Sequence, residues 1–79
     1  MTLNEALAAR INELLQEKNI TQYGLFKRSG VSAQEISQIR HQRNKSNSLN
    51  IVFQLAQGFE MSLMQFFDSP LFGYENVAD

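Results

Sequence analysis

The stretch TQYGLFKRSGVSAQEISQIRH, residues 21–41, contains the start and stop signals of two short helices. Thr21 is a good N-cap and Gly30 a good stop for the first of them. Ser32, followed three residues later by Glu35, has the pattern of a capping box that starts the second. The two helices are predicted over residues 22–29 and 33–41.

The sequence on either side also has helical patterning. Thr2 and Glu5 form another capping-box pattern, and leucine and isoleucine then recur at helical spacing. Asn19 can adopt the left-handed conformation that ends a helix. Ser48 and Ser62 are N-caps for two further helices. These helices are predicted over residues 3–18, over 49–59 and in a short stretch after Ser62.

Length and composition indicate one small domain. The chain has 79 residues, of which 43% are hydrophobic, and a single proline, which fits a globular domain without a long linker. Five short helices and no strand signal predict an all-α, compact five-helix fold. Residues 1–67 are expected to form the domain. Residues 68–79 are expected to form a C-terminal tail that packs either on the core or on a dimer partner.

Several classes of site are not expected. The chain has no cysteine, which excludes disulfides, cysteine-ligated zinc and a thiol nucleophile. With His41 as the single histidine and no nucleophile motif or glycine-rich phosphate loop, we expect no metal, no cofactor and no catalytic residue. No apolar run is long enough to span a membrane, and the first residues do not resemble a signal peptide. A cytoplasmic protein is therefore expected.

The positive charge is concentrated in one segment. The chain has a net charge of −1, yet residues 27–45 hold five basic side chains and one carboxylate, for a net +4, and the remainder has −5. A polyanion would be attracted to this segment and repelled by the rest. The alternative is that these residues form a solvated basic loop without a partner.

The predicted helix over 33–41 has a polar outer face. At 100° per residue Ile36 and Ile39 define its buried side, and the opposite side carries Gln34, Ser37, Gln38 and His41. An amide can pair in bidentate fashion with the major-groove edge of adenine, and basic residues follow directly, where the chain would meet phosphate. Glutamine and serine also occur on helix surfaces simply for solubility. The joint arrangement favours a face that meets nucleic acid.

The sequence ITQYGLFKRSGVSAQEISQIRHQRNKSNSLNIVFQLAQGFEMSLMQFF, residues 20–67, resembles the helix-turn-helix domain of the phage lambda repressor and Cro type, also called the xenobiotic-response-element type. With the first helix included, the resemblance covers about residues 3–67. It implies that the second and third helices form a helix-turn-helix whose third helix enters the major groove. The positions in register are Thr21, Gln22, Leu25, Ser29, Gly30, Val31, Ser32, Ile36, Ser37, Ile39, Ser48, Leu49, Ala56, Ser62, Leu63 and Phe67.

The resemblance also implies a role for individual residues. Gln22 matches a position that touches phosphate and can brace a side chain of the recognition helix. Glu35 is assigned to the capping box, since a carboxylate facing phosphate would be repelled. The residues that would read bases are Ala33, Gln34, Ser37 and Gln38. Those that would contact phosphate are Gln22, Arg40, His41, Arg43, Asn44 and Lys45.

Four residues depart from the family pattern. Phe26 stands where a small alanine is usual, so its ring either fills the core or forces the second and third helices apart. Gln42 replaces the glycine after the third helix, where a left-handed conformation would cost about 1 kcal/mol. The others are Asn47, which replaces a proline, and Glu60, which replaces a glycine.

The function that the resemblance implies is sequence-specific binding of double-stranded DNA by a bacterial or prophage transcription regulator, acting as a homodimeric repressor on an operator. A chain of this length has no room for a ligand-sensing domain, so no small-molecule ligand is expected. The alternative is a protein-interaction module that keeps the fold, favoured by the overall acidity, Phe26 and the apolar tail. An antitoxin or a restriction-modification controller would also use this fold. The residues predicted to contact a dimer partner are Ile51, Leu55, Leu71, Phe72 and Tyr74.

Overall fold

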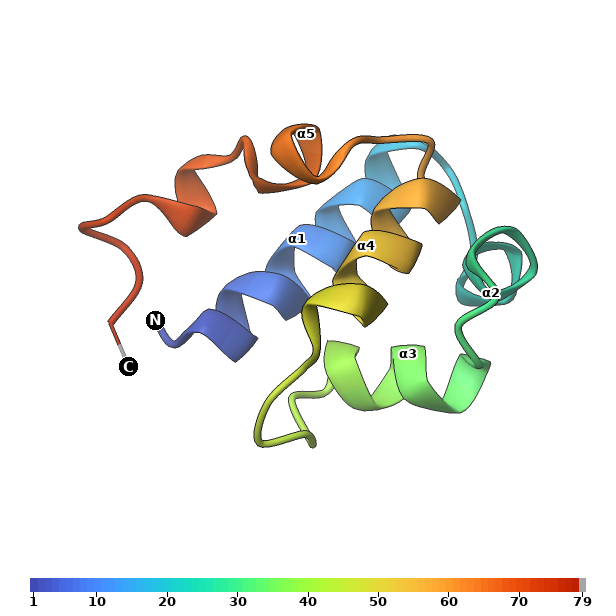
Figure 1. The fold of residues 1–79 in the computed structure, drawn as a ribbon, viewed down its shortest axis with the longest axis horizontal. Coiled ribbons are helices and arrows are strands. Elements are labelled where there is room, and N and C mark those ends of the chain that lie inside the picture. The colour runs from blue at the N-terminus through green and yellow to red at the C-terminus, as the bar shows by residue number, and fades with distance from the viewer. Residues whose placement is uncertain (79) are drawn as a thin grey trace.

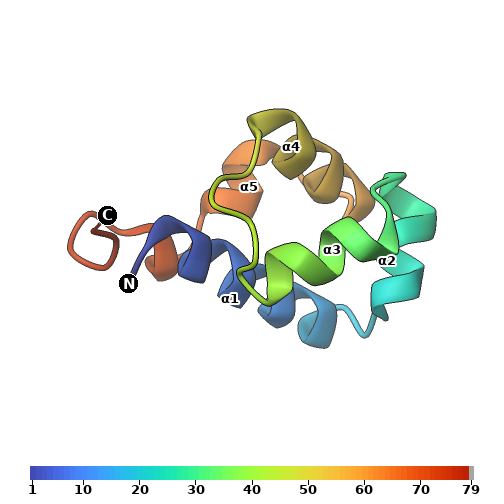
Figure 2. The same cartoon turned by 90° about the horizontal axis from the view of Figure 1, so that it is seen from below.

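The computed structural model describes residues 1–78, and Asp79, the last residue of the predicted tail, lies outside them. Within residues 1–78 every regular element is helical and no strand occurs, which confirms the all-α, five-helix prediction. The elements are α1 (Leu3–Glu17), α2 (Gln22–Ser29), α3 (Ala33–Arg40), α4 (Leu49–Gly58), α5 (Leu63–Phe67) and a 3-10 helix, η1 (Pro70–Phe72). Figure 1 shows α3 at one edge of the molecule, and Figure 2 looks onto that edge.

Hydroxyl side chains define where the five α-helices begin. In each case the N-cap oxygen accepts a hydrogen bond from a backbone N–H in the first turn, which would otherwise have no partner. The caps are Thr2, Thr21, Ser32, Ser48 and Ser62. At α1 the capping box is complete, and hydrogen bonds from the Thr2 backbone N–H and then its side chain lower the pKa of Glu5.

The helix ends differ slightly from the predictions. α1, α3 and α4 each end one residue earlier than predicted, because the next residue already serves as the C-cap. Asn19 has the predicted left-handed conformation, with φ 55°, and Gly30 has φ 78°. Glu60, with φ 61°, adopts the same conformation without being glycine. Local strain of about 1 kcal/mol is therefore present at Glu60.

The core lies between the helices, and every α-helix contributes buried side chains to it. α1 packs against α3, and α2 packs against both α3 and α4. The largest fully buried side chains are Ile11, Leu14, Leu25, Ile36, Leu55, Phe59 and Phe66. The inward-facing isoleucines of α3 therefore hold this helix on the core and turn its other side outward.

α2 packs closely against α4 at Gly58. A Cβ atom at Gly58 would lie 2.8 Å from the Cβ of Ser29 and 3.0 Å from a methyl group of Leu25. Only a residue without a side chain fits this spacing without a shift of α2. The position of α2, and with it the helix-turn-helix, thus depends on a glycine in α4.

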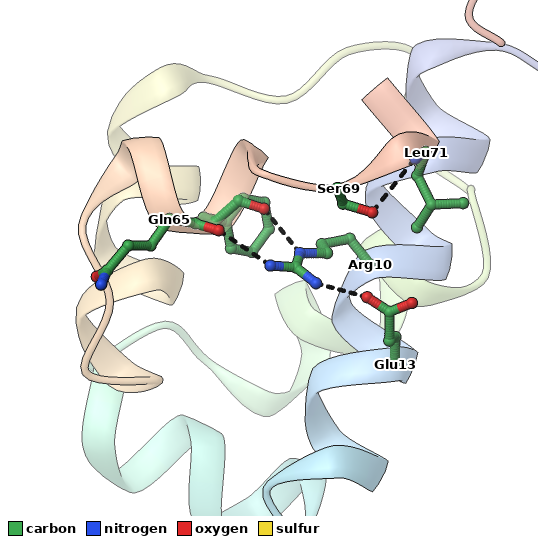
Figure 3. Close-up of polar contacts among 6 residues, drawn as sticks. Arg10, Glu13, Gln65, Ser69 and Leu71 are labelled. Carbon is green, nitrogen blue, oxygen red and sulfur yellow. Dashed lines mark hydrogen bonds and ion pairs between the residues drawn. The ribbon is translucent and has the colours of Figure 1, made fainter. Parts of the chain in front are cut away.

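A buried arginine joins α1 to α5. Arg10 is only 7% exposed. Its guanidinium donates to the backbone carbonyls of Phe66 at 2.7 Å and Gln65 at 3.0 Å, and pairs with Glu13 at 2.5 Å (Figure 3). These carbonyls belong to the last turn of α5, where few backbone donors remain, and the Gln65 carbonyl also accepts from the Asp68 N–H at 3.2 Å. Arg10 therefore both caps α5 and fixes it to α1.

Residues 68–78 fold back along α1 toward the first residue of the chain (Figure 1). The Met1 ammonium donates to the Asn76 carbonyl at 2.9 Å, and the Ala78 N–H donates to the Met1 carbonyl at 2.9 Å. The ring of Phe72 packs edge-on against Phe67, with centroids 4.9 Å apart. In the described chain the tail thus packs on the domain itself.

We predict that Gly58→Ala destabilises the fold. Overpacking costs roughly 1–3 kcal/mol, and the better helix propensity of alanine returns about 1 kcal/mol, so a net loss of about 1 kcal/mol is expected in urea denaturation followed by circular dichroism. Gln57→Ala, at the exposed neighbour, is the control and should change stability little. A Gly58→Ala protein more stable than wild type would contradict the close contact.

We also predict that Arg10→Met lowers the free energy of unfolding by about 2 kcal/mol, because the carbonyls at the end of α5 lose a charged donor. The same urea measurement checks this. Arg28→Met, at an exposed arginine of α2, removes the same charge and should leave stability nearly unchanged. Equal stability of the two variants would show that Arg10 does not hold α5 in place.

Candidate nucleic-acid interface

The outer face of α3 is open and carries unpaired amides. Gln34 is exposed and Gln38 partly exposed, while Ile36 and Ile39 are buried on the opposite side. Within residues 1–78 the side-chain amides of both glutamines have no hydrogen-bond partner, so each keeps a donor and an acceptor for a ligand. Ala33 and Ser37 are partly exposed on the same helix.

His41 closes the end of this face. Its Nδ1 lies 2.8 Å from the Ser37 carbonyl oxygen and 3.4 Å from the Ser37 hydroxyl. A carbonyl can only accept, so Nδ1 carries the proton and Nε2 is the ring nitrogen left for an external contact. Ser37 and His41 therefore act as a pair at the open edge of α3.

The chain leaves α3 through a strained turn. The Gln42 N–H donates to the Ile39 carbonyl at 3.1 Å and the Arg43 N–H to the Gln38 carbonyl at 2.9 Å, which is the Schellman pattern. Gln42 occupies the left-handed position, with φ 57°, so the cost expected from the missing glycine is present. Arg43, the residue directly after Gln42, is exposed.

Asparagines hold the loop that follows. Asn4 of α1 donates to the carbonyls of Asn44 and Lys45, both at 3.0 Å, and accepts from Asn47 at 3.0 Å. The Asn44 amide donates to Asn47 at 3.0 Å and, at 3.4 Å, to Glu35. Asn44 is thus turned into the protein, whereas Arg43 and Lys45 are exposed. Asn47, where the family has proline, takes part in this network.

The capping box predicted at Ser32 and Glu35 is only half formed. Ser32 accepts from the Glu35 N–H at 3.1 Å, as a capping box requires. The Glu35 carboxylate, however, accepts from Asn44. The physical reason is competition: the loop after α3 brings an amide within reach of the carboxylate. Glu35 therefore links α3 to the basic loop.

Arg40 is also turned back into the domain. Its Nε donates to the Asn12 side chain at 2.6 Å and its Nη1 to the Gln22 side chain at 2.8 Å. The Gln22 amide donates to the Ala33 carbonyl at 3.2 Å. Two of the residues predicted to contact phosphate, Arg40 and Gln22, thus contact each other and join α1, α2 and α3.

Phe26 neither fills the core nor forces the helices apart. It is partly buried and packs against the edge of the core. Its ring lies edge-on to Tyr23, with centroids 5.9 Å apart. α2 and α3 remain in contact, with the Phe26 ring beside Tyr23 of the same helix.

The five residues predicted for a dimer contact differ in burial. Leu55 is completely buried in its own core, which leaves no surface for a partner. Phe72 packs on the core, and Ile51 and Leu71 are half-buried. Tyr74 is 97% exposed. The apolar residues that α4 does expose are Leu49 and Phe53.

Sequence reasoning missed three polar residues of α1. Asn4 and Asn12 hold the loop and Arg40, and an asparagine on a helix gives no signal for such a contact. Arg10 did give a signal, since helical spacing places it on the apolar face of α1 among Leu7, Ile11 and Leu14. A basic residue at such a position predicts a buried polar partner.

A family model, that of the Cro/C1-type HTH DNA-binding domain, matches residues 10–68. The chain belongs to this family. No curated protein and no solved structure shows significant similarity to it. The match to the Cro/C1-type domain begins inside α1 and ends after α5, so Asn4 and the tail from Ser69 onward lie outside it.

Within residues 1–78 no three histidine, aspartate or glutamate side chains come together in a way that could hold a metal ion. None of the described helices is both long and apolar enough to cross a membrane. The chemistry that α3 offers is hydrogen bonding by amides beside two exposed cations.

Proposed function

We propose that this Cro/C1-type domain is a sequence-specific DNA-binding transcription regulator that acts as a repressor by occupying an operator. The observation that carries the proposal is the open amide face of α3, followed directly by the exposed Arg43 and Lys45. Gln34 and Gln38 would read base edges in the major groove. Arg43 and Lys45 would bind phosphate and fix the register.

Charge distribution supports a single docking orientation. The segment 27–45 has a net charge of +4 in a chain of net −1. Within this segment Arg43 and Lys45 are exposed directly after α3, so phosphate would be attracted to that side of the domain and repelled by the acidic remainder. A weakly acidic protein can bind DNA in this way as long as its basic residues face the backbone.

We further propose that the protein acts as a cytoplasmic homodimer. α4 contains no charged side chain and exposes Leu49 and Phe53, and depletion of charge with aromatic enrichment is typical of the centre of an interface. Ile51 and the exposed Tyr74 could extend the contact. A two-fold pair would present two α3 helices about one DNA turn apart, roughly 34 Å.

A second candidate function is a protein-interaction module without specific DNA binding. It is favoured by the exposure of Met64 (84%) on α5 and of Tyr74 in the tail. Single exposed apolar residues are common, so this candidate ranks below DNA binding.

We predict that selection from randomised duplex DNA at about 0.1 M salt enriches a near-palindrome whose half-sites lie about one helical turn apart. Sequencing of the bound pool is the measurement. Enrichment of a single half-site would contradict the dimer but would still support sequence-specific DNA binding. A pool without enrichment would overturn sequence-specific binding and favour the protein-interaction candidate.

We predict different effects for the two kinds of contact. Gln38→Ala should reduce discrimination between the selected and a random duplex by about 1–3 kcal/mol, the value of a lost bidentate pair. Arg43→Ala should weaken both duplexes alike and lower the slope of log affinity against log salt by about 0.9. Affinities come from fluorescence anisotropy at several salt concentrations.

Matched controls for this pair lie on other helices. Gln57→Ala removes an exposed amide of α4, and Arg28→Ala removes an exposed cation of α2 beside the end of α4. Gln57→Ala should not change DNA binding appreciably, and Arg28→Ala, which lowers the charge of segment 27–45 by one, should weaken binding much less than Arg43→Ala. Equal effects of Arg28→Ala and Arg43→Ala would show that attraction is general and that Arg43 has no specific contact.

A further inference from the structure

The guanidinium of Arg40 faces the domain and not the open side of α3. Its two hydrogen bonds, to Asn12 at 2.6 Å and to Gln22 at 2.8 Å, have a charged donor and are therefore stronger than neutral ones. A direct contact between Arg40 and a phosphate would compete with both acceptors. The position of Arg40 at the end of a recognition helix thus does not by itself make it a DNA ligand.

The partner of Arg40, Gln22, is held at both ends of its amide. The Oε1 atom accepts from Arg40, and Nε2 donates to the carbonyl of Ala33 at 3.2 Å. Ala33 and Arg40 are the first and last residues of α3, about 10 Å apart along its axis. One amide of α2 therefore connects both ends of the recognition helix.

This pairing fixes which way the amide points. Rotating the Gln22 amide by 180° would place Oε1 against the Ala33 carbonyl and Nε2 against the guanidinium. Two acceptors would then face each other at Ala33 and two donors at Arg40, so only one orientation is stable. In that orientation the second N–H of Nε2 has no acceptor within residues 1–78, and it is the group that an anion would bind.

We propose that Arg40 is a positioning residue that acts on DNA through Gln22. Its charge orients the Gln22 amide so that Nε2, and not Oε1, is available to a phosphate, and Asn12 holds the guanidinium in the place where it does this. The inference rests on the proposed DNA binding of α3. It assigns to Arg40 an indirect role and to Asn12 a supporting one.

The test compares Arg40→Met with Arg40→Lys on the selected duplex. Both should weaken binding about 3- to 10-fold, the effect of one disordered hydrogen bond. Lysine keeps the charge but cannot hold two acceptors in a fixed fork, so it should not rescue. The salt slope of Arg40→Lys should equal that of wild type. Recovery of wild-type affinity with lysine would show direct charge contact and overturn the proposal.

A double-mutant cycle tests whether the effect passes through Gln22. In a Gln22→Ala background, Arg40→Met should weaken binding no further, because the amide it orients is gone. A loss from Arg40→Met that persists undiminished in this background would overturn the inference. Circular dichroism of each variant ensures that the compared proteins are folded.

A measurement without DNA separates failure of this inference from failure of the proposed function. In the free protein the Nε2 proton of Gln22 that donates to Ala33 should exchange with solvent more slowly than the Nε2 protons of the exposed Gln57, measured by NMR, and Arg40→Met should abolish the difference. Fast exchange in wild type overturns the inference even if DNA binds. Slow exchange in a protein that binds no specific DNA overturns the proposed function and the role of Arg40 on DNA with it.

Discussion

The contact of α3 with α1 is the constraint on which the candidate interface depends. Ile36 and Ile39 bury one side of a helix of only eight residues, and a helix this short is unstable without tertiary packing. Polar side chains of α1 then hold the end of α3 and the loop after it, which the apolar contact does not fix. Asn12 holds Arg40 at the end of α3, and Asn4 holds the loop beyond it. The apolar contact thus leaves the amides on the outer side of α3, and the polar contacts keep Arg40 and the loop in place beside them.

Local signals in the sequence were enough to predict most of the fold. A serine or threonine begins each α-helix because its hydroxyl satisfies an N–H of the first turn, and this effect needs no knowledge of distant residues. Gly30 and Asn19 ended helices for a similarly local reason. The outward side of α3 followed from two isoleucines at helical spacing.

The parts that could not be predicted depend on contacts between distant segments. Asn4 meets a loop about forty positions away, and Arg10 meets the end of α5; no periodicity encodes such pairs. The same limit explains Glu35, whose carboxylate had a local partner and a tertiary one, and the tertiary one, Asn44, prevailed. Gly58 is a further case, because its lack of a side chain matters only through the side chains of α2 that pack against it.

The central claim is that α3 and the loop after it form the surface that binds DNA. A titration of the 15N-labelled protein with short duplex DNA, followed by amide NMR, tests this most directly. The account predicts that shift changes concentrate at residues 33–45 and at the start of α2, and are small in α4, α5 and the tail. Changes confined to α4, α5 or the tail, with α3 unaffected, would contradict it.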